Sequence, residues 1–303
     1  MLNKILISGA GGMVGRAVRN RLLLDYDKGE IICTDYIPNG RLNIKRMDVT
    51  SGSEIHRMID GRSIDAILHL AALVAGPPSE KKPQEYLEVN VMGTVNILEK
   101  MRRYDIPKIV YLSSWSTFGT DITLPIDEST EQNPRNPYGT SKVMAEKAVK
   151  LYSELYGLEA VVLRPTMLYA PLQHEKNIVQ QVVDCMVSGE TFEIWGEGTH
   201  TRELLHADDM ANIVFDSLHY DPDGGYDLFI VGTETPLSVI DVATAGQEIS
   251  HFPIKFVPSN KWVFDQRSDM TKLKMRVGIN PDNFINIKDG LFECYRYRLG
   301  NYN

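Results

Sequence analysis

Residues 5–15 read Ile5-Leu-Ile-Ser-Gly9-Ala-Gly-Gly12-Met-Val-Gly15, an apolar run followed by glycines at three-residue spacing. Glycines spaced in this way allow a tight turn, close approach of the backbone to a pyrophosphate, and close packing of a helix on the preceding strand. Such loops also occur as plain strand-to-helix connections, but this loop follows an apolar run near the N-terminus. The segment therefore predicts a dinucleotide-binding loop in which Gly9, Gly12, Met13, Val14 and Gly15 lie against the cofactor.

Downstream of this loop, short apolar runs alternate with amphipathic segments. Together with the run that precedes the loop, the apolar runs span residues 4–8, 30–34, 65–70, 108–113 and 159–164. Each of them predicts a buried strand. The clearest helical patterns span residues 12–24, 84–104 and 138–156. Alternation of strands and helices is typical of a parallel sheet covered on both faces. We therefore expect an α/β, doubly wound Rossmann fold.

After Arg164-Pro165 the pattern changes to shorter elements separated by glycine and proline. We expect helices at residues 176–188 and 207–218 and after Ser238, a strand at 192–195, turns at 222–225 and at Pro253, and the end of a strand at Pro258. Residues 1–170 are thus the predicted dinucleotide-binding Rossmann domain, with contributions from about 207–235. Residues 171–303 are predicted to form mostly a small C-terminal α/β substrate-binding region.

Composition excludes several classes of protein. The net charge of −8 lacks the basic excess that binding to a nucleic-acid backbone requires. Cys33, Cys185 and Cys294 are far apart and form no C-x-x-C pair, which argues against a disulfide framework and against a zinc site, and we expect no metal site. No apolar run reaches the roughly 18 residues that a membrane span needs. We expect a cytoplasmic protein that binds neither nucleic acid nor membrane.

Two aspartates are predicted to select the cofactor. Asp35 ends the second apolar run, about 20 residues after the glycine loop, where a carboxylate accepts hydrogen bonds from ribose hydroxyls and repels a 2′-phosphate. NAD is therefore expected rather than NADP, although Asp35 could also be a simple turn residue. By the same logic, Asp48 and Val49 are expected to contact the adenine.

A phenol and an ammonium lie one helical turn apart in Tyr138-Gly-Thr-Ser-Lys142. A neighbouring cation lowers the pKa of a phenol from about 10, so that tyrosinate can take a proton from a substrate hydroxyl. Ser114 follows a predicted buried strand, at the sheet edge where ligands of such folds bind, and could hold the reacting oxygen. Each residue alone has an ordinary explanation, as an exposed helix face or a cap. Behind a dinucleotide loop, the three together predict hydride-transfer chemistry.

With these residues identified, the chain resembles the extended short-chain dehydrogenase/reductase family, and within it the UDP-glucose 4-epimerase branch. The residues that carry the resemblance are Gly9, Gly12, Gly15, Asp35, Asp48, His69, Leu70, Ala71, Ala72, Asn90, Ser114, Tyr138, Lys142, Arg164 and Pro165. The resemblance implies that Ala71 and Asn90 lie near the adenosine and phosphates of NAD and Thr166 near the nicotinamide. It also implies cofactor contacts by Leu70, Ala72, Ser113, Tyr138 and Lys142.

In the second half, residues 195–209 resemble the segment with which that family holds a nucleoside diphosphate. Arg202 would bind the diphosphate with the several N–H donors of its guanidinium. The alternative interpretation is that Arg202 is merely an exposed charged residue. His206 is more readily explained as an interior histidine. The substrate contacts implied by the resemblance are Ser114, Ser116, Tyr138, Met167, Trp195, Arg202 and Arg267. Met167 departs from the family's asparagine, and Arg267 is only a substitute for a missing Arg-Pro segment.

The expected activity is NAD-dependent oxidoreduction at a sugar carbon of a nucleotide sugar, at C4, by an epimerase or a dehydrogenase/ketoreductase. Because Trp115 and Ser116 replace the acidic pair of the sugar-dehydratase branch, dehydration is disfavoured. One alternative is an NAD-dependent dehydrogenase of a small hydroxy or amino acid, similar to threonine dehydrogenase. Another is an NAD-binding protein without turnover. The family resemblance also implies a homodimer joined through the long helices at 84–104 and 138–156.

Overall fold

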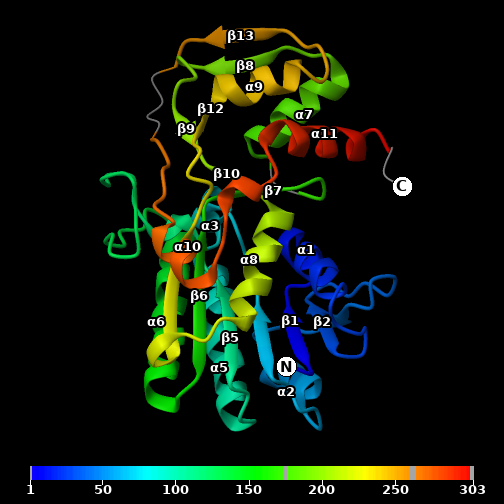
Figure 1. The fold of residues 1–303 in the computed structure, drawn as a ribbon, viewed down its shortest axis with the longest axis vertical. Coiled ribbons are helices and arrows are strands. Elements are labelled where there is room, and N and C mark those ends of the chain that lie inside the picture. The colour runs from blue at the N-terminus through cyan, green and yellow to red at the C-terminus, as the bar shows by residue number, and fades with distance from the viewer. Residues whose placement is uncertain (1, 174–175, 260–263, 301–303) are drawn as a thin grey trace.

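The computed structural model describes residues 2–173, 176–259 and 264–300. Its centre is a parallel sheet of seven strands in the order β11-β6-β5-β4-β1-β2-β3 (Figure 1). These strands are β1 (Ile5–Ser8), β2 (Ile31–Asp35), β3 (Lys45–Arg46), β4 (Ala66–His69), β5 (Lys108–Leu112), β6 (Glu159–Pro165) and β11 (Tyr226–Val231). The predicted doubly wound α/β fold is confirmed.

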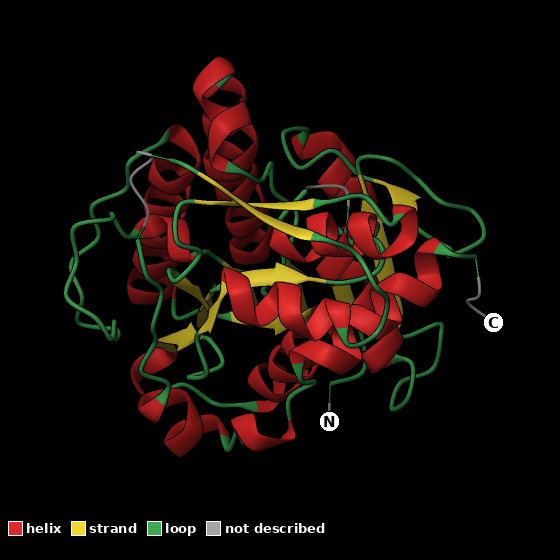
Figure 2. Ribbon diagram, turned by 90° about the horizontal axis from the view of Figure 1, so that it is seen from above, coloured by secondary structure: helices red, strands yellow, loops and turns green. Residues whose placement is uncertain are grey.

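Helices cover both faces of this sheet, as Figure 2 shows from above. Ile5 and Ile7 of β1 pack into the core shared with α1 (Met13–Leu22) and α8 (Ala207–His219). Leu6, between them, packs into the opposite core, with α2 (Gly52–Ile59), α5 (Gly93–Arg103) and α6 (Pro137–Tyr156). Because successive strand residues point to opposite faces, both faces of β1 must be apolar. This explains why the strands appear as continuous apolar runs in the sequence.

The expected single helix over residues 84–104 is wrong in one respect. The chain instead forms α4 (Pro83–Leu87), a π-helical turn η1 (Glu88–Met92) and then α5. A π turn inserts an extra residue into the helix and is often found at functional sites. Asn90 lies within this turn, and its side chain bonds to other segments of the chain instead of facing solvent. Helical periodicity in the sequence does not reveal such a local change of hydrogen bonding.

A smaller region lies beyond the carboxyl ends of the central strands (Figure 1). Its strand pairs are β8 (Phe192–Trp195) with β13 (Ile254–Val257), β7 (Met167–Tyr169) with β10 (Leu204–His206), and β9 (Thr201–Arg202) with β12 (Leu237–Ser238). Its helices include α7 (Ile178–Ser188), α9 (Val239–Gln247) and α11 (Ile287–Arg298), which share a hydrophobic core of their own. The remaining short helices are α3 (Gly76–Lys81), α10 (Thr271–Val277), η2 (Trp115–Thr117), η3 (Asp223–Gly225) and η4 (Pro281–Asn283). In the part of the chain that is described, no helix has the length and apolar character needed to cross a membrane.

Candidate active site

The glycine loop lies at the point where the strand order of the sheet reverses. β1 pairs with β2 on one side and with β4 on the other, so the loops after β1 and β4 meet at the carboxyl edge of the sheet. Gly9 has a φ of +79°, and a Cβ there would lie 2.6 Å from the Ala71 amide nitrogen. A Cβ at Gly15 would lie 2.0 Å from the Gly9 carbonyl oxygen. The close approach of these loops therefore requires glycine at both positions.

The first turn of α1 presents unpaired backbone donors to this loop. Gly12 is the N-cap residue and, as a glycine, has no side chain with which to cap the helix. The first N–H groups of a helix, here those of Met13 and Val14, have no partner within the helix, and the helix dipole is positive at this end. Asp35 ends β2 beside the loop, where its Oδ2 accepts a hydrogen bond from the Gly11 amide at 2.9 Å. A diphosphate and a ribose diol fit this combination of donors and acceptor.

Other expected cofactor residues lie around the same edge. Leu70, Ala71 and Ala72 follow β4 and are half-buried. Asp48 uses its Oδ1 to accept hydrogen bonds from the Thr50 amide at 2.9 Å and the Thr50 hydroxyl at 2.8 Å. Val49 is buried beneath α5. Part of the hydrogen-bonding capacity of Asp48 is thus committed to its own turn.

Asn90 ties the loop after β4 to the helix α6. Its Oδ1 accepts a hydrogen bond from the Leu73 amide at 2.8 Å. Its Nδ2 donates to the Leu73 carbonyl and to the Ser141 hydroxyl, each at 2.9 Å. Both amide hydrogens therefore have partners within the chain, and the residue holds the loop in place.

Tyr138 and Lys142 lie on the buried side of α6. Asn136 caps this helix by accepting a hydrogen bond from the Gly139 amide at 2.9 Å, and Ser79 accepts one from the Tyr138 amide at 3.1 Å. The ring of Tyr86 meets the Tyr138 ring edge-on, with centroids 6.2 Å apart. These contacts fix the first turn of the helix, and with it the Tyr138 side chain. Sequence reasoning missed Ser79 and Tyr86 because no local pattern connects them to Tyr138.

The Lys142 ammonium is held beneath the end of β5. Its Nζ donates to the Leu112 carbonyl oxygen at 2.7 Å and lies 3.4 Å from the Tyr111 hydroxyl. Burial lowers the pKa of Lys142 to about 7, and the Glu146 carboxylate acts in the opposite direction. The charge of Lys142 is therefore sensitive to each of its few neighbours.

Ser114 stands at the carboxyl end of β5, as expected. Its Oγ accepts a hydrogen bond from the Ser116 amide at 3.1 Å, which makes it the N-cap of η2. Because the hydroxyl acts there as an acceptor, its own hydrogen can be donated elsewhere. Ser114 and Ser116 are both half-buried. The cap interpretation and the catalytic interpretation of Ser114 are thus compatible.

A buried ion pair between Glu146 and Arg164 holds the segment that leads into η2. Glu146 Oε1 accepts hydrogen bonds from Arg164 Nε at 3.0 Å and from the Ser113 hydroxyl. Its Oε2 accepts from Arg164 Nη2 and from Gln132 Nε2, each at 2.7 Å. One carboxylate thereby joins α6, β5, β6 and the loop that precedes α6. The sequence held a signal for Glu146, since it lies four residues after Lys142 on the same helix face.

At the end of β6, Thr166 has a buried side-chain hydroxyl for which the described residues provide no hydrogen-bond partner. A buried polar atom without a partner is costly, so it marks a position where a bound molecule can supply one. Met167 follows and begins β7, where it pairs with Leu204. The side chain of Met167 is half-buried and offers no polar contact.

The expected diphosphate contacts lie in the smaller region. Arg202 donates from Nη1 to the carbonyl oxygens of Thr201, at 2.8 Å, and Phe264, and its guanidinium lies 4.2 Å from the centroid of the Phe264 ring. Trp195 ends β8 and is 52% exposed. Arg267 is exposed, and its carbonyl oxygen accepts a hydrogen bond from the Ile126 amide at 2.9 Å. Arg202 is therefore partly engaged by the chain itself.

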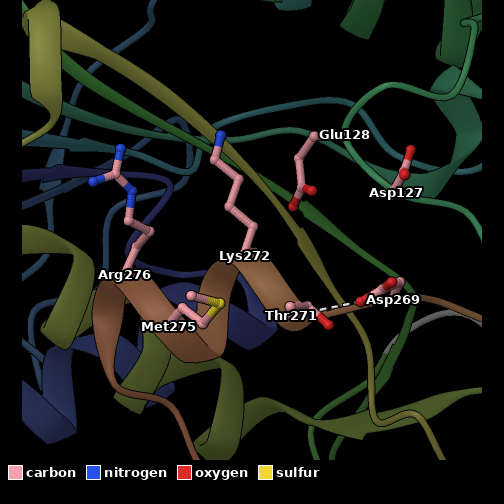
Figure 3. Close-up of a pocket in the computed structure, with 7 residues that line it drawn as sticks. All are labelled: Asp127, Glu128, Asp269, Thr271, Lys272, Met275 and Arg276. Carbon is pink, nitrogen blue, oxygen red and sulfur yellow. Dashed lines mark hydrogen bonds between the residues drawn. The ribbon is translucent and has the colours of Figure 1, made fainter.

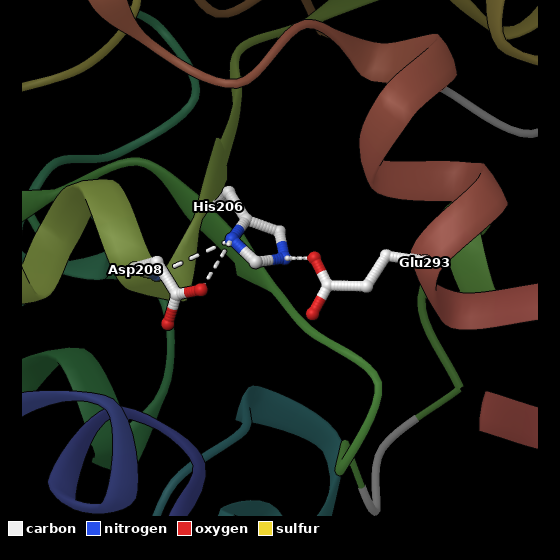
Figure 4. Close-up of side chains that lie close together, drawn as sticks. All are labelled: His206, Asp208 and Glu293. Carbon is white, nitrogen blue, oxygen red and sulfur yellow. Dashed lines mark hydrogen bonds and ion pairs between the residues drawn. The ribbon is translucent and has the colours of Figure 1, made fainter. Parts of the chain in front are cut away.

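His206 is buried and lies between two carboxylates (Figure 4). Its Nδ1 accepts a hydrogen bond from the Asp208 amide at 3.3 Å and lies 3.8 Å from Asp208 Oδ2, whereas its Nε2 lies 3.4 Å from Glu293 Oε2. The two carboxylates approach different ring nitrogens, although ligand atoms of the three side chains lie within 4.8 Å of one another. His206 is an interior histidine at the contact between the start of α8 and α11.

A separate cavity of about 360 Å³ lies against α10 (Figure 3). It is lined by Asp127, Glu128, Asp269, Thr271, Lys272, Met275 and Arg276. None of these belongs to the glycine loop or to α6. Glu128 accepts a hydrogen bond from the Ile230 amide at 2.8 Å, and Lys272 pairs with Asp227. Charged groups of this cavity are thus already used to join α10, β11 and the 120–136 loop.

Comparison with known proteins gives one consistent result. The model of the NAD dependent epimerase/dehydratase family matches residues 5–231. A putative UDP-glucose 4-epimerase of Methanocaldococcus jannaschii is 33% identical over 218 residues, which cover 68% of this chain and 70% of that protein. A dTDP-D-glucose 4,6-dehydratase of Dictyostelium discoideum is 27% identical, covering 80% of this chain and 61% of that protein. The structure of UDP-glucose 4-epimerase from Bifidobacterium longum in complex with NAD+ and UDP has a TM-score of 0.84 at 24% identity, and covers 98% of both chains.

Proposed function

The chain belongs to the NAD-dependent epimerase/dehydratase family, and on this premise we propose that it oxidises C4 of the sugar in a nucleotide sugar, with Tyr138 as the acid/base. The observation that carries the proposal is the burial of Tyr138 and Lys142 on α6, which packs through Gly139 against the η2 turn that Ser114 caps. All three lie at the carboxyl edge of the parallel sheet, where ligands of this fold bind.

The residues around the strand-order reversal fit NAD. The first turn of α1 offers backbone donors for the pyrophosphate, and Asp35 offers an acceptor for the ribose hydroxyls. The unpartnered Thr166 hydroxyl can receive the polar edge of the nicotinamide. When bound, NAD supplies the group that accepts and returns hydride.

The residues of the chain divide the proton chemistry among themselves. Ser114 donates its free hydroxyl hydrogen to the reacting oxygen of the sugar. Tyr138, as tyrosinate, takes the proton of the sugar hydroxyl while the hydride leaves the carbon that carries this hydroxyl. The Lys142 ammonium favours the tyrosinate by its charge, because a nearby cation stabilises an anion in a buried site. Asn90 and Ser79 keep the loop after β4 in register with α6.

Elimination of water is not part of this proposal. Trp115 occupies the position after Ser114, is buried and packs edge-on against Phe118, with ring centroids 5.9 Å apart. Neither Trp115 nor Ser116 offers the carboxyl group that a dehydration would need as acid or base. Epimerisation, or a single oxidation or reduction, requires only the residues already described.

The test is proton NMR of the sugar anomeric region after incubation of the protein and catalytic NAD with UDP-glucose, and in parallel with GDP- and dTDP-linked hexoses. We expect a new epimer signal with one of these nucleotides. Unchanged spectra, together with no thermal stabilisation by UDP, GDP or dTDP alone, would instead favour a dehydrogenase of a small hydroxy or amino acid. A nucleoside diphosphate that binds the folded protein must raise its apparent stability.

Gly15→Ala should weaken NAD binding by about tenfold or more and destabilise the fold by roughly 1–3 kcal/mol, as overpacked sites do. The new Cβ would lie within 2.7 Å of backbone atoms of both Gly9 and Ala10, so the loop would have to move. Calorimetric titration with NAD and a thermal melt measure the two effects. Gly52→Ala is the matched control, since nothing lies within 4 Å of a Cβ there. Equal NAD affinity in both variants would contradict the proposed binding loop.

We also propose a homodimer, joined through α6 and the neighbouring η1. Met144, Leu151 and Leu155 lie at intervals of seven and four along α6 and are exposed, as is Met92 of η1. An exposed apolar stripe of this kind is typical of a helical interface. Light scattering should give twice the mass of one chain, and Leu151→Glu with Leu155→Glu should reduce it to one. A monomeric wild-type protein at micromolar concentration would refute this.

A further inference from the structure

Tyr111 contacts the Lys142 ammonium with both its hydroxyl and its ring. Lys142 Nζ lies 3.4 Å from the Tyr111 hydroxyl oxygen and 4.9 Å from the centroid of the ring. A hydroxyl lone pair and the face of an aromatic ring both attract a cation, and they do so more strongly when water is excluded. Tyr111 is 1% exposed and Lys142 is 3% exposed. Because the pair is buried, this attraction is largely unscreened.

The Thr94 hydroxyl on α5 joins η1 to β4. It donates its single hydrogen to the Asn90 carbonyl oxygen at 2.6 Å and accepts a hydrogen bond from His69 Nε2 at 3.0 Å. The Tyr111 oxygen in turn accepts a hydrogen bond from Lys142 Nζ, so one of its lone pairs faces the ammonium.

His69 keeps this arrangement of hydrogens fixed. With Nε2 donating to Thr94, its Nδ1 accepts a hydrogen bond from the Ser8 hydroxyl at 2.6 Å. Burial lowers the pKa of His69 to about 3, and the Lys142 charge acts in the same direction. The ring is therefore neutral at neutral pH and places no second positive charge beside Lys142.

We propose that Tyr111 is a positioning residue for Lys142, whose ammonium it holds between β5 and α6 through its hydroxyl oxygen and its ring face. The inference rests on the proposed role of Lys142 in catalysis. The titratable groups that face Lys142 are His69 from β4, Tyr111 from β5, and Tyr138 and Glu146 from α6. Of these, Glu146 is already fully engaged by Arg164, Ser113 and Gln132. Glu146 acts on Lys142 only through its charge, whereas Tyr111 contacts the ammonium directly.

The test is a titration of Lys142 itself, in the full-length chain labelled with [ε-13C]lysine and followed by NMR. The resonance of Lys142 is the one that disappears in Lys142→Arg, and it should titrate far below the other lysines. Tyr111→Phe removes the hydroxyl and keeps the ring. It should lower the midpoint of that resonance by about one pH unit, the size expected for a lost hydrogen bond to a charged group.

Two further variants make the result decisive. Tyr220→Phe removes a tyrosine hydroxyl that donates to Asp227 of the edge strand β11 at 2.8 Å. This variant should leave the titration midpoint of Lys142 unchanged. Tyr111→Met removes both the hydroxyl and the ring, should lower the midpoint further, and replaces Tyr111→Phe if that variant fails to fold. An unchanged midpoint in folded Tyr111→Phe, or in Tyr111→Met where it stands in, would overturn the proposal.

Enzyme assays provide a second measurement. The substrate is UDP-glucose or another nucleotide sugar that the anomeric NMR experiment identifies. In Tyr111→Phe the alkaline limb of the plot of kcat against pH should move to lower pH by about one unit, with KM unchanged. A purely structural role would lower activity equally at all pH values. If no nucleotide sugar is turned over, the proposed function fails, but the lysine titration still decides the role of Tyr111.

Discussion

Tyr138→Phe should lower kcat by about two to four orders of magnitude and leave KM nearly unchanged, because it removes the proposed general acid/base and little else. The phenylalanine ring keeps the edge-on contact with Tyr86, and the Tyr138 amide keeps its hydrogen bond to Ser79. The loss should therefore appear in the chemical step. Initial rates with the nucleotide sugar that the anomeric NMR experiment identifies measure it, alongside NAD affinity by calorimetry.

Tyr156→Phe is the matched control on the same helix. Tyr156 is exposed at the far end of α6, where its ring meets Tyr152 edge-on, and the variant should retain wild-type kcat. If Tyr138→Phe retained kcat within about threefold, Tyr138 would not be the acid/base, because such a group typically contributes at least a hundredfold. Loss of NAD binding in Tyr138→Phe would instead indicate that the residue is needed for the cofactor site.

The fold and the centre of the site could be predicted because their signals are local. Glycine spacing after an apolar run specifies a strand, a loop and a helix start within a dozen residues. Likewise, the interval from Tyr138 to Lys142 places both on one helix face. The strands of the smaller region are harder to predict from sequence, because β9 and β12 contain only two residues each, too few to show any periodicity.

The support of the site could not be predicted, because it depends on contacts between distant segments. His69, Thr94 and Tyr111 come from β4, α5 and β5, and the sequence around each residue does not indicate that it lies near the other two. The π turn at Asn90 is similar, since its reason lies in the bonds to Leu73 and Ser141. Glu146 is intermediate: its helix face could be inferred from Lys142, but its pairing with Arg164 could not.

The pairing of Glu146 with Arg164 predicts the largest effect on stability. Glu146→Gln should lower the free energy of unfolding by about 3–5 kcal/mol, because it leaves the Arg164 guanidinium buried without its counterion. Arg164 is 5% exposed and donates two hydrogen bonds to the carboxylate. Urea unfolding measures the change as a lower midpoint at constant slope. The same carboxylate holds Ser113, next to Ser114, so kcat should also fall.

The comparison with an exposed pair on the same helix isolates burial as the cause. Lys150 and Glu154 lie one turn apart, with Nζ and Oε1 3.8 Å apart, and both are exposed. Glu154→Gln should cost less than about 0.5 kcal/mol, since water already screens that pair. Glu146→Leu combined with Arg164→Met should recover part of the stability by removing both charges, although Ser113 and Gln132 would lose their acceptor. A Glu146→Gln protein as stable as Glu154→Gln would show that the buried pair does not brace the catalytic turn.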